Sequence, residues 1–302
     1  MERQTDLGEV HTLTVRIGTI EVGDKSSLLL IAGPCVIESW EQIYKTGQAL
    51  KEICKELDIN YVFKASFDKA NRTSYNSFRG PGLEKGLEML AELKSKLGLP
   101  VLSDLHDESQ CAPAARVLDM IQIPAFLCRQ TDLVCAAAKT GKAINIKKGQ
   151  FVAPLDILHS VKKVTECGNK NVTVTERGST FGYNNLVVDY RAIPMIQSAG
   201  VPLIFDATHS VQLPSAGGGV SGGDRKFIPQ LTRAALAAGA DGLFMEVHPN
   251  PDEAQSDAST QIPLWQVRDL LLQCKQVFDL VRQMPDINLP DKGQCIEPAF
   301  AR

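Results

Sequence analysis

Eight apolar runs recur along the chain, and a stretch with helical spacing follows each of them. The runs are nearly continuous in their apolar character, which is typical of parallel strands buried on both faces. Each run ends in a polar or reactive residue, and these are Cys35, Lys64, Asp104, Gln122, Lys147, Arg177, His209 and Glu246. Eight strand–helix repeats predict an α/β protein with a single (β/α)8 barrel, the TIM barrel fold.

The connections between the strands predict the helices and the chain's organisation. We expect helices at residues 39–56, 82–97, 108–117, 131–140, 155–166, 189–198, 226–239 and 264–284. Residues 11–22 alternate apolar and polar, which predicts a β-hairpin that closes the N-terminal end of the barrel. We therefore expect one domain over residues 1–302, with the hairpin at 11–22, the barrel at 27–284 and a polar tail at 285–302. An open doubly wound sheet is the alternative, but no GxGxxG turn follows the first strand.

Composition and charge argue against several classes of protein. A net charge of −3 provides no general attraction for nucleic acid, so we expect no such partner. No run reaches the ~20 apolar residues of a membrane span, and the polar start lacks the apolar segment of a signal peptide. The eight cysteines form no CxxC pair, which favours free thiols in a reducing compartment. These features predict a cytoplasmic protein without a membrane partner.

Cations gather at the predicted strand ends. Lys64, Lys147 and Arg177 end apolar strands, where a buried charge needs a partner or a ligand. More cations follow in the adjacent loops, at Lys69, Arg72, Arg79, Arg129 and Lys148. Because barrels of this kind carry their sites at the C-terminal ends of the strands, the cluster predicts a ligand with several negative charges. Structural ion pairing is the alternative interpretation.

A second group of strand ends has the chemistry of a metal site. Cys35, His209 and Glu246 end the first, seventh and eighth strands, which become neighbours when a barrel closes, and Asp257 follows in the next loop. A thiolate, an imidazole and two carboxylates suit a divalent transition metal such as Fe²⁺, Zn²⁺, Mn²⁺ or Co²⁺. Cys and His inside strands are also common as plain core residues, and His248 is a competing ligand candidate.

Several segments that carry these residues resemble one enzyme family. They lie within residues 29–260 and include LIAGPCVIES, FKASFDKANRTS, IQIPAFLCRQTDL, INIKKGQF, ERGSTFGYNNLVVD, FDATHSVQLP and FMEVHPNPDEAQSDAST. On these segments the chain closely resembles the 3-deoxy-D-manno-octulosonate 8-phosphate synthases. The resemblance implies a (β/α)8 barrel, usually a homotetramer, that serves lipopolysaccharide biosynthesis. Such a transferase condenses phosphoenolpyruvate with D-arabinose 5-phosphate and water, and it releases inorganic phosphate.

The resemblance also implies roles for individual residues. The metal ligands would be Cys35, His209, Glu246 and Asp257, and Cys35 indicates the metal-dependent branch because Asn replaces it in the metal-independent one. Phosphoenolpyruvate would be bound by Lys64, Lys69, Gln122, Lys147 and Arg177. The sugar phosphate would be bound by Asn71, Arg72, Thr73 and Arg129, where Arg72 and Arg129 reach a neighbouring subunit's site. The catalytic candidates are Lys69, Asp104, His106, His209 and Glu246.

Two other functions stay open on the sequence. The sister enzyme, 3-deoxy-D-arabino-heptulosonate 7-phosphate synthase, shares the barrel and phosphoenolpyruvate but takes erythrose 4-phosphate. It carries a KPRT-like motif where this chain has KANRT, and a hydrogen-bonding Asn71 suits the longer sugar. The other alternative is a metabolite-binding barrel without catalysis, although a chemically competent residue stands at each motif position.

Overall fold

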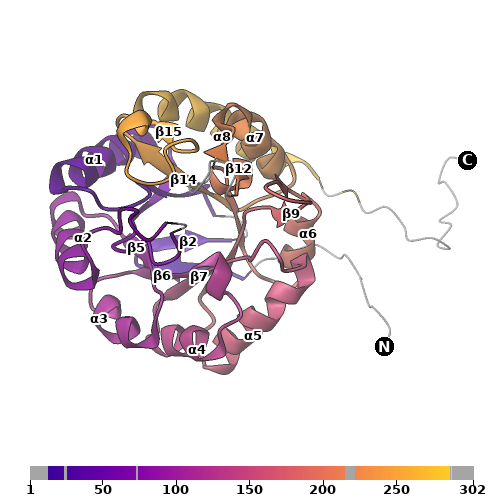
Figure 1. Cartoon of the computed structure of the whole chain (residues 1–302). Helices are drawn as coiled ribbons and strands as arrows, with labels where there is room; N and C mark the ends of the chain where they lie inside the picture. The colour runs from indigo at the N-terminus through magenta and orange to yellow at the C-terminus, as the bar shows by residue number, and fades with distance from the viewer. Residues whose placement is uncertain (1–12, 24–25, 73, 215–221, 286, 288–302) are drawn as a thin grey trace, which may run out of the picture.

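The computed structural model describes residues 13–23, 26–72, 74–214, 222–285 and 287. Its centre is a closed ring of parallel strands, β3 (Leu29–Gly33), β4 (Asn60–Lys64), β5 (Val101–Asp104), β6 (Met120–Ile123), β7 (Ala143–Lys147), β8 (Val172–Glu176), β11 (Leu203–Asp206) and β14 (Gly242–His248). Neighbours in this order pair in parallel, and β14 pairs with both β3 and β11, which closes the ring. Figure 1 shows the helices surrounding it. The predicted (β/α)8 barrel is confirmed.

The eight outer helices are α1 (Trp40–Glu56), α2 (Leu83–Leu97), α3 (Cys111–Ala115), α4 (Thr131–Lys139), α5 (Leu158–Glu166), α6 (Ala192–Gln197), α7 (Ile228–Ala237) and α8 (Leu264–Gln283). The third and sixth helices are shorter than predicted. Because proline fits only the first turn of a helix, α3 and α6 begin just ahead of Pro113 and Pro194. Within the described segments, no helix is long and apolar enough to cross a membrane.

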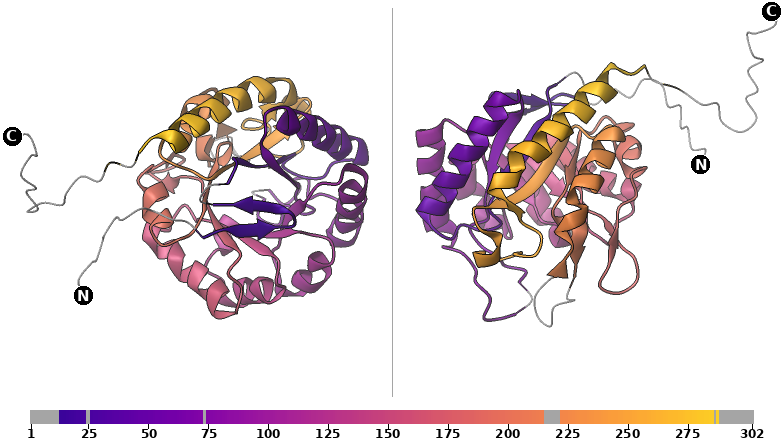
Figure 2. Two further views of the ribbon diagram at one scale, coloured as in Figure 1. Left: turned by 180° about the vertical axis from the view of Figure 1, so that it is seen from behind. Right: turned by 90° about the horizontal axis from the view of Figure 1, so that it is seen from above.

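The predicted hairpin is confirmed over the part of it that the structure describes. Strands β1 (Val15–Ile17) and β2 (Ile20–Val22) pair antiparallel through a turn in which Gly18 adopts a φ of 59°. Figure 2 shows this hairpin lying across the N-terminal end of the barrel. Residues 11–12 lie outside the described residues. So does nearly all of the predicted tail at 285–302, which stays a prediction.

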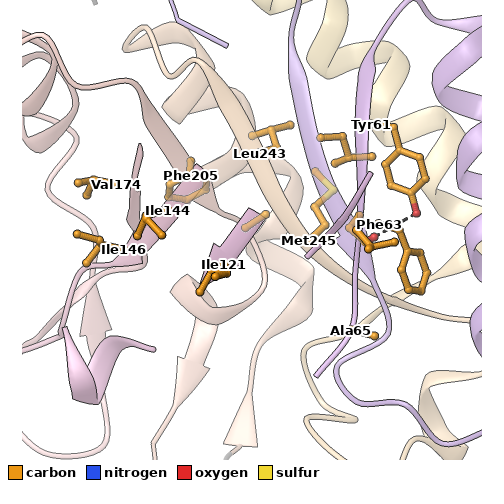
Figure 3. Close-up of a cluster of buried hydrophobic side chains, with 14 of the residues drawn as sticks. Tyr61, Phe63, Ala65, Ile121, Ile144, Ile146, Val174, Phe205, Leu243 and Met245 are labelled. Carbon is orange, nitrogen blue, oxygen red and sulfur yellow. Dashed lines mark hydrogen bonds between the residues drawn. The ribbon is translucent and has the colours of Figure 1, made fainter. Parts of the chain in front are cut away.

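Side chains on each barrel strand alternate between the helices and the interior. The outward set fills the space under the helices, and the members labelled in Figure 3 are Tyr61, Phe63, Ala65, Ile121, Ile144, Ile146, Val174, Phe205, Leu243 and Met245. The inward set is smaller and packs against the hairpin. It consists of Leu29, Ile31, Val62, Leu102, Met120, Ala143, Ile204 and Phe244, with Val15, Ile17 and Val22 from the hairpin. The barrel interior is therefore apolar at its N-terminal end.

The same alternation brings polar side chains into the barrel interior at its C-terminal end. Two residues after an inward apolar residue, each of several strands has an inward polar one, so that Lys64 follows Val62 and Glu246 follows Phe244. The prediction that the seventh strand ends at His209 is wrong, because β11 ends at Asp206. His209 instead begins a 3₁₀ turn, η4 (His209–Val211). Asp206 therefore holds the inward position at this strand end.

Candidate active site

A cavity of about 470 Å³ opens at the C-terminal end of the barrel. Most of the predicted site residues line it, namely Lys64, Lys69, Asn71, Arg72, Asp104, Gln122, Lys147, Arg177, His209, Glu246 and Asp257. Cys35 and His106 are not in its lining, but each contacts a residue that is. Thr73 lies outside the described residues. The fold thus brings together side chains that are almost two hundred residues apart in the chain.

The four predicted metal ligands converge beside this cavity. Donor atoms of Cys35, Glu246 and Asp257 lie within 4.8 Å of one another, and Cys35 Sγ is 3.2 Å from Asp257 Oδ2. His209 Nε2 lies 3.6 Å from Glu246 Oε1 and 3.8 Å from Asp257 Oδ2. Soft sulfur, imidazole nitrogen and carboxylate oxygen together form a donor set for a divalent transition metal.

Glu246 provides the test of whether a cation fits here. Its side chain is fully buried, and its Oε2 has no hydrogen-bond partner among the described residues. A buried carboxylate oxygen without a partner is costly, and a bound cation would remove that cost. Although burial opposes ionisation, the charges of His209 and Lys64 lower the pKa of Glu246 to about 2. The carboxylate is therefore ionised and available to a metal ion.

Cys35 differs from Glu246 because its resting form is the protonated thiol, whereas a metal ligand must be the thiolate. Burial, reinforced by the charge of Glu246, raises the pKa of the Cys35 thiol well above its ordinary value. Only a thiolate binds a metal strongly, so binding must release the thiol proton. Metal affinity at this site should accordingly increase with pH.

The loop after β14 places Asp257 toward the other ligands. Asp257 has a φ of 50°, in the left-handed region that Asp tolerates better than most residues. Its carbonyl accepts hydrogen bonds from the amides of Thr260 and Gln261. The Gln261 side chain in turn accepts a hydrogen bond from the Cys35 amide, at 3.2 Å. Two ligand-bearing loops are thereby tied to each other through one buried glutamine.

The cationic wall of the cavity is built from buried side chains. Lys64 Nζ donates to Glu246 Oε1 at 3.3 Å, and Lys147 Nζ contacts Asp206 Oδ2 at 2.5 Å. Arg177 Nη2 donates to the His209 carbonyl, while its buried Nε has no partner among the described residues. Burial lowers the pKa values of Lys147 and Arg177. Negative charge in the cavity would offset that cost of burial.

Asp206 is a site residue that the sequence interpretation missed. Its carboxylate contacts Lys147 and His209 Nδ1, the latter at 2.9 Å, and it also accepts from the His209 amide. Burial opposes ionisation, yet the charges of His209 and Lys147 hold the pKa of Asp206 well below its usual range. A carboxylate on Nδ1 fixes the imidazole so that Nε2 faces the metal ligands. The signal was present, since Asp206 directly follows the apolar run LIF.

The proton-handling candidates form a separate contact set. His106 Nε2 lies 3.0 Å from Asp104 Oδ2, and Ser66 donates to the other oxygen of Asp104. Burial would raise the pKa of Asp104, but His106 and Lys64 lower it well below its ordinary value. Asp104 faces the cavity and His106 stands behind it. Asp104 is therefore ionised and presents its charge to the cavity, while His106 and Ser66 hold its two oxygens.

The predicted sugar-phosphate residues are divided in space. Asn71 and Arg72 line the cavity, and Arg72 donates two hydrogen bonds to the Tyr75 carbonyl within the same loop. Arg129 is exposed and is not among the described residues that line this cavity. Within one copy of the chain, Arg129 therefore does not join the other residues predicted to hold the sugar phosphate.

Fold and site together define a (β/α)8 barrel whose C-terminal mouth combines a wall of buried cations with a cluster of side chains that could hold a metal ion. The family model of the DAHP synthetase I family matches residues 6–283, and the chain belongs to this family. DAHP abbreviates 3-deoxy-D-arabino-heptulosonate 7-phosphate, the product of the sister enzyme.

Curated relatives share most of the chain. A protein of Trichlorobacter lovleyi is 55% identical over 90% of this chain and all of its own length, and one of Desulfosudis oleivorans is 57% identical over 86% of this chain and 94% of its own. A protein of Francisella tularensis is 50% identical over 91% of this chain and all of its own length. Each of the three is named 2-dehydro-3-deoxyphosphooctonate aldolase.

Proposed function

We propose that the chain condenses phosphoenolpyruvate with D-arabinose 5-phosphate and water to give 3-deoxy-D-manno-octulosonate 8-phosphate and inorganic phosphate. The observation that carries the proposal is the cavity wall, in which Lys64, Lys147 and Arg177 are buried beside a metal-competent cluster. Phosphoenolpyruvate brings a carboxylate and a phosphate to such a wall. The name of the relatives describes the same eight-carbon phosphorylated acid.

The reaction joins two carbon atoms, adds water to C2 and breaks the bond between C2 and the phosphate oxygen. C3 of phosphoenolpyruvate bonds to the aldehyde carbon of the sugar, while water bonds through its oxygen to C2 and gives up one proton, which balances the proton that the aldehyde oxygen takes. The bond between C2 and the phosphate oxygen then breaks, the C2 hydroxyl passes its proton to the departing phosphate, and C2 becomes the carbon of a ketone. Positive charge develops at C2 and negative charge at the aldehyde oxygen, so the site must stabilise both signs.

The chain's own residues supply charges of both signs. Arg177 lines the cavity and offers guanidinium N–H groups to the phosphoenolpyruvate anion, and the buried Lys64 and Lys147 add fixed positive charge to the same wall. Asp104, whose low pKa keeps it ionised, presents a carboxylate to the cavity, and we assign the pair that it forms with His106 to the proton transfers of the reaction. Lys69 Nζ lies 3.9 Å from Glu246 Oε1 and can donate toward the reacting enol ether.

A divalent metal ion, Fe²⁺, Zn²⁺, Mn²⁺ or Co²⁺, would be held by Cys35, His209, Glu246 and Asp257. Such an ion supplies fixed positive charge that polarises a carbonyl oxygen or acidifies water. The unpartnered Glu246 Oε2 and the close approach of Cys35 to Asp257 support this ligand set. Asp206 would hold the His209 ring in place for either role of such an ion.

The acceptor sugar distinguishes the proposed reaction from that of the sister enzyme. Asn71 lines the cavity, where its amide can bind a hydroxyl of a five-carbon sugar. The test measures phosphate released from phosphoenolpyruvate with arabinose 5-phosphate or erythrose 4-phosphate. We expect the five-carbon sugar to be used far more efficiently. Preference for erythrose 4-phosphate would identify the sister activity, and no release with either sugar would favour a binding barrel.

We propose a homotetramer in which Arg129 completes the sugar-phosphate site of a neighbouring copy. The exposure of Arg129 and its absence from the described residues that line its own cavity support this assignment. Sedimentation should give a tetramer, whereas a fully active monomer would contradict it. A cytoplasmic location and a place in lipopolysaccharide biosynthesis are part of the same proposal. The free cysteines of the described segments support a reducing compartment.

A further inference from the structure

Gln212 lies between the metal cluster and Arg177, and the sequence analysis predicted no role for it. We infer that Gln212 is a positioning residue that couples the metal cluster to the anion-binding Arg177, so that each ligand strengthens the binding of the other. The inference rests on the proposed function for the identity of the anion, phosphoenolpyruvate. It concerns binding, and it requires no turnover.

The Gln212 side chain uses both ends of its amide. It is buried, with 8% of its surface exposed. Its Oε1 accepts a hydrogen bond from Arg177 Nη2 at 2.8 Å, and its Nε2 donates to Asp257 Oδ1 at 3.0 Å. An uncharged amide is suited to this place, because it offers an acceptor to the guanidinium and a donor to the carboxylate.

A second path joins the same two partners. Arg177 Nη2 also donates to the His209 carbonyl at 3.2 Å, and His209 Nε2 lies 3.8 Å from Asp257 Oδ2. Arg177 is therefore held at one nitrogen by two acceptors, while its buried Nε has no partner among the described residues. The position of the Arg177 guanidinium thus depends on His209 and Asp257, two of the proposed metal ligands.

The fold holds Gln212 in this place through a short hairpin. Strand β12 (Gln212–Leu213) pairs with β13 (Gly222–Gly223), and Gln212 stands opposite Gly223. A Cβ on Gly223 would lie 2.1 Å from the side chain of Thr260, so the hairpin lies directly against the segment that follows Asp257. Arg225 strengthens the contact by donating to the carbonyl of Ala258. The loops after β11 and β14 therefore act as one packed unit.

This arrangement couples the binding of the metal ion to the binding of the anion, because each of them immobilises side chains that the other needs. A metal ion that fixes Asp257 also fixes Gln212, which in turn fixes Arg177 before the anion arrives. The anion then binds to a side chain whose freedom has already been lost, and by linkage it strengthens metal binding equally. Direct attraction between cation and anion adds to the coupling and does not depend on Gln212, so removal of Gln212 should leave part of it.

The test compares Gln212→Met with Gln197→Met. The first variant keeps the length of the side chain and removes both hydrogen bonds. Gln197 is its matched control, since it is equally buried and donates to the carboxylate of Asp241 at 2.8 Å, at the opposite end of the barrel. The dissociation constant of Co²⁺ is measured with and without phosphoenolpyruvate, from the visible absorption of the Co²⁺–thiolate complex, with no sugar present.

We expect phosphoenolpyruvate to tighten Co²⁺ binding by roughly 5- to 150-fold in the wild type and in Gln197→Met. In Gln212→Met this ratio should fall by roughly threefold or more. Gln212→Glu is the second variant: its carboxylate keeps an acceptor for Arg177 but loses the donor to Asp257, so its ratio should fall as well. If Gln212→Met does not fold, Gln212→Glu gives the same comparison.

Different outcomes overturn different claims. A Gln212 variant that folds and keeps the wild-type ratio, or a wild type without any coupling, overturns the inference and leaves the proposed function standing. A wild type that binds Co²⁺ and not phosphoenolpyruvate contradicts the proposed function, and the inference fails with it.

Discussion

The interior of the barrel is filled by apolar side chains at its N-terminal end and by charged side chains at its C-terminal end. At the N-terminal end, Val15, Ile17 and Val22 of the hairpin close an interior made of apolar side chains. At the C-terminal end, the inward positions of the same strands bury charged groups, among them Lys64 and Glu246. An apolar end stabilises the fold directly, while the charged end costs solvation free energy that only partners or a ligand offset.

Two buried aspartates, one at each end of the barrel, have pKa values shifted in opposite directions. Asp241, at the start of β14, accepts hydrogen bonds from the Leu203 amide, Gln197 and Arg282, and burial nevertheless raises its pKa. Asp206, at the end of β11, lies between Lys147 and His209, and its pKa falls well below the usual range. The C-terminal end therefore keeps its carboxylates ionised, as a site for metal and phosphate chemistry requires.

The largest effect should follow from removing the metal. Chelation should abolish phosphate release, and Fe²⁺, Mn²⁺, Co²⁺ or Zn²⁺ should restore it to different extents. Cys35→Ser should lower bound metal sharply, since a hydroxyl is a poor substitute for a thiolate. Metal analysis of protein purified without chelator makes the measurement.

A buried thiol without metal chemistry is the control. Cys54 lies in α1, and burial raises its pKa to about 12, yet Cys54→Ser should leave metal content unchanged. Cys35→Asn, which copies the metal-independent branch, should retain some activity without metal. A fully active, metal-free wild type would end the metal hypothesis and leave the barrel and the substrates untouched.

The next effect concerns stability at the charged end. Lys148 is fully buried, with its Nζ 3.5 Å from Glu176 Oε2 and 3.0 Å from the Val152 carbonyl. Lys148→Met should lower the free energy of unfolding by about 3–5 kcal/mol, because it leaves Glu176 as a buried charge without its cation. Urea denaturation measures this change. The exposed pair of Lys162 and Glu166 is the control, and Lys162→Met should cost less than about 1 kcal/mol.

Truncation of Arg177 should separate the functions of the two ends. Arg177→Ala should remove about 2–5 kcal/mol of binding free energy, because the bound anion loses its hydrogen bonds to the guanidinium. The value of kcat/KM for phosphoenolpyruvate should then fall roughly 30- to 4,000-fold. Arg282→Ala, which removes the cationic partner of Asp241 at the N-terminal end, should leave this constant close to the wild-type value. Near-normal kcat/KM in Arg177→Ala would show that Arg177 is not a substrate ligand.

The smallest effect is a pH dependence at the apolar end. A carboxyl group whose folded pKa is raised binds its proton more tightly in the folded protein, so its contribution to stability grows as the pH falls through the folded pKa. The contribution is complete below the unfolded pKa of about 3.9. Relative to Asp241→Asn, the wild type should therefore gain stability as the pH is lowered toward that value. Thermal unfolding at several pH values tests this, and a constant difference would contradict the raised pKa.

Much of the fold and part of the site could be predicted because both depend on local pattern. The apolar runs gave the eight strands, and their last residues gave Lys64, Lys147 and Glu246, which do line the cavity. The error at His209 came from extending the apolar run past Asp206 into the following turn. Inward and outward positions alternate along a strand, and applying that period of two would have identified Asp206.

The sequence by itself determined the barrel and the kinds of chemical group at its mouth, because strand periodicity and residue type are local properties. Only the tertiary structure decided which groups meet. Gln212 does not end an apolar run, and its role appears when β13 packs against the loop that carries Asp257. Arg129 stands close to a predicted strand end and nevertheless does not line its own cavity. Such contacts depend on how loops from distant strands pack in three dimensions, and the spacing of residues along the chain does not encode the distances between those loops.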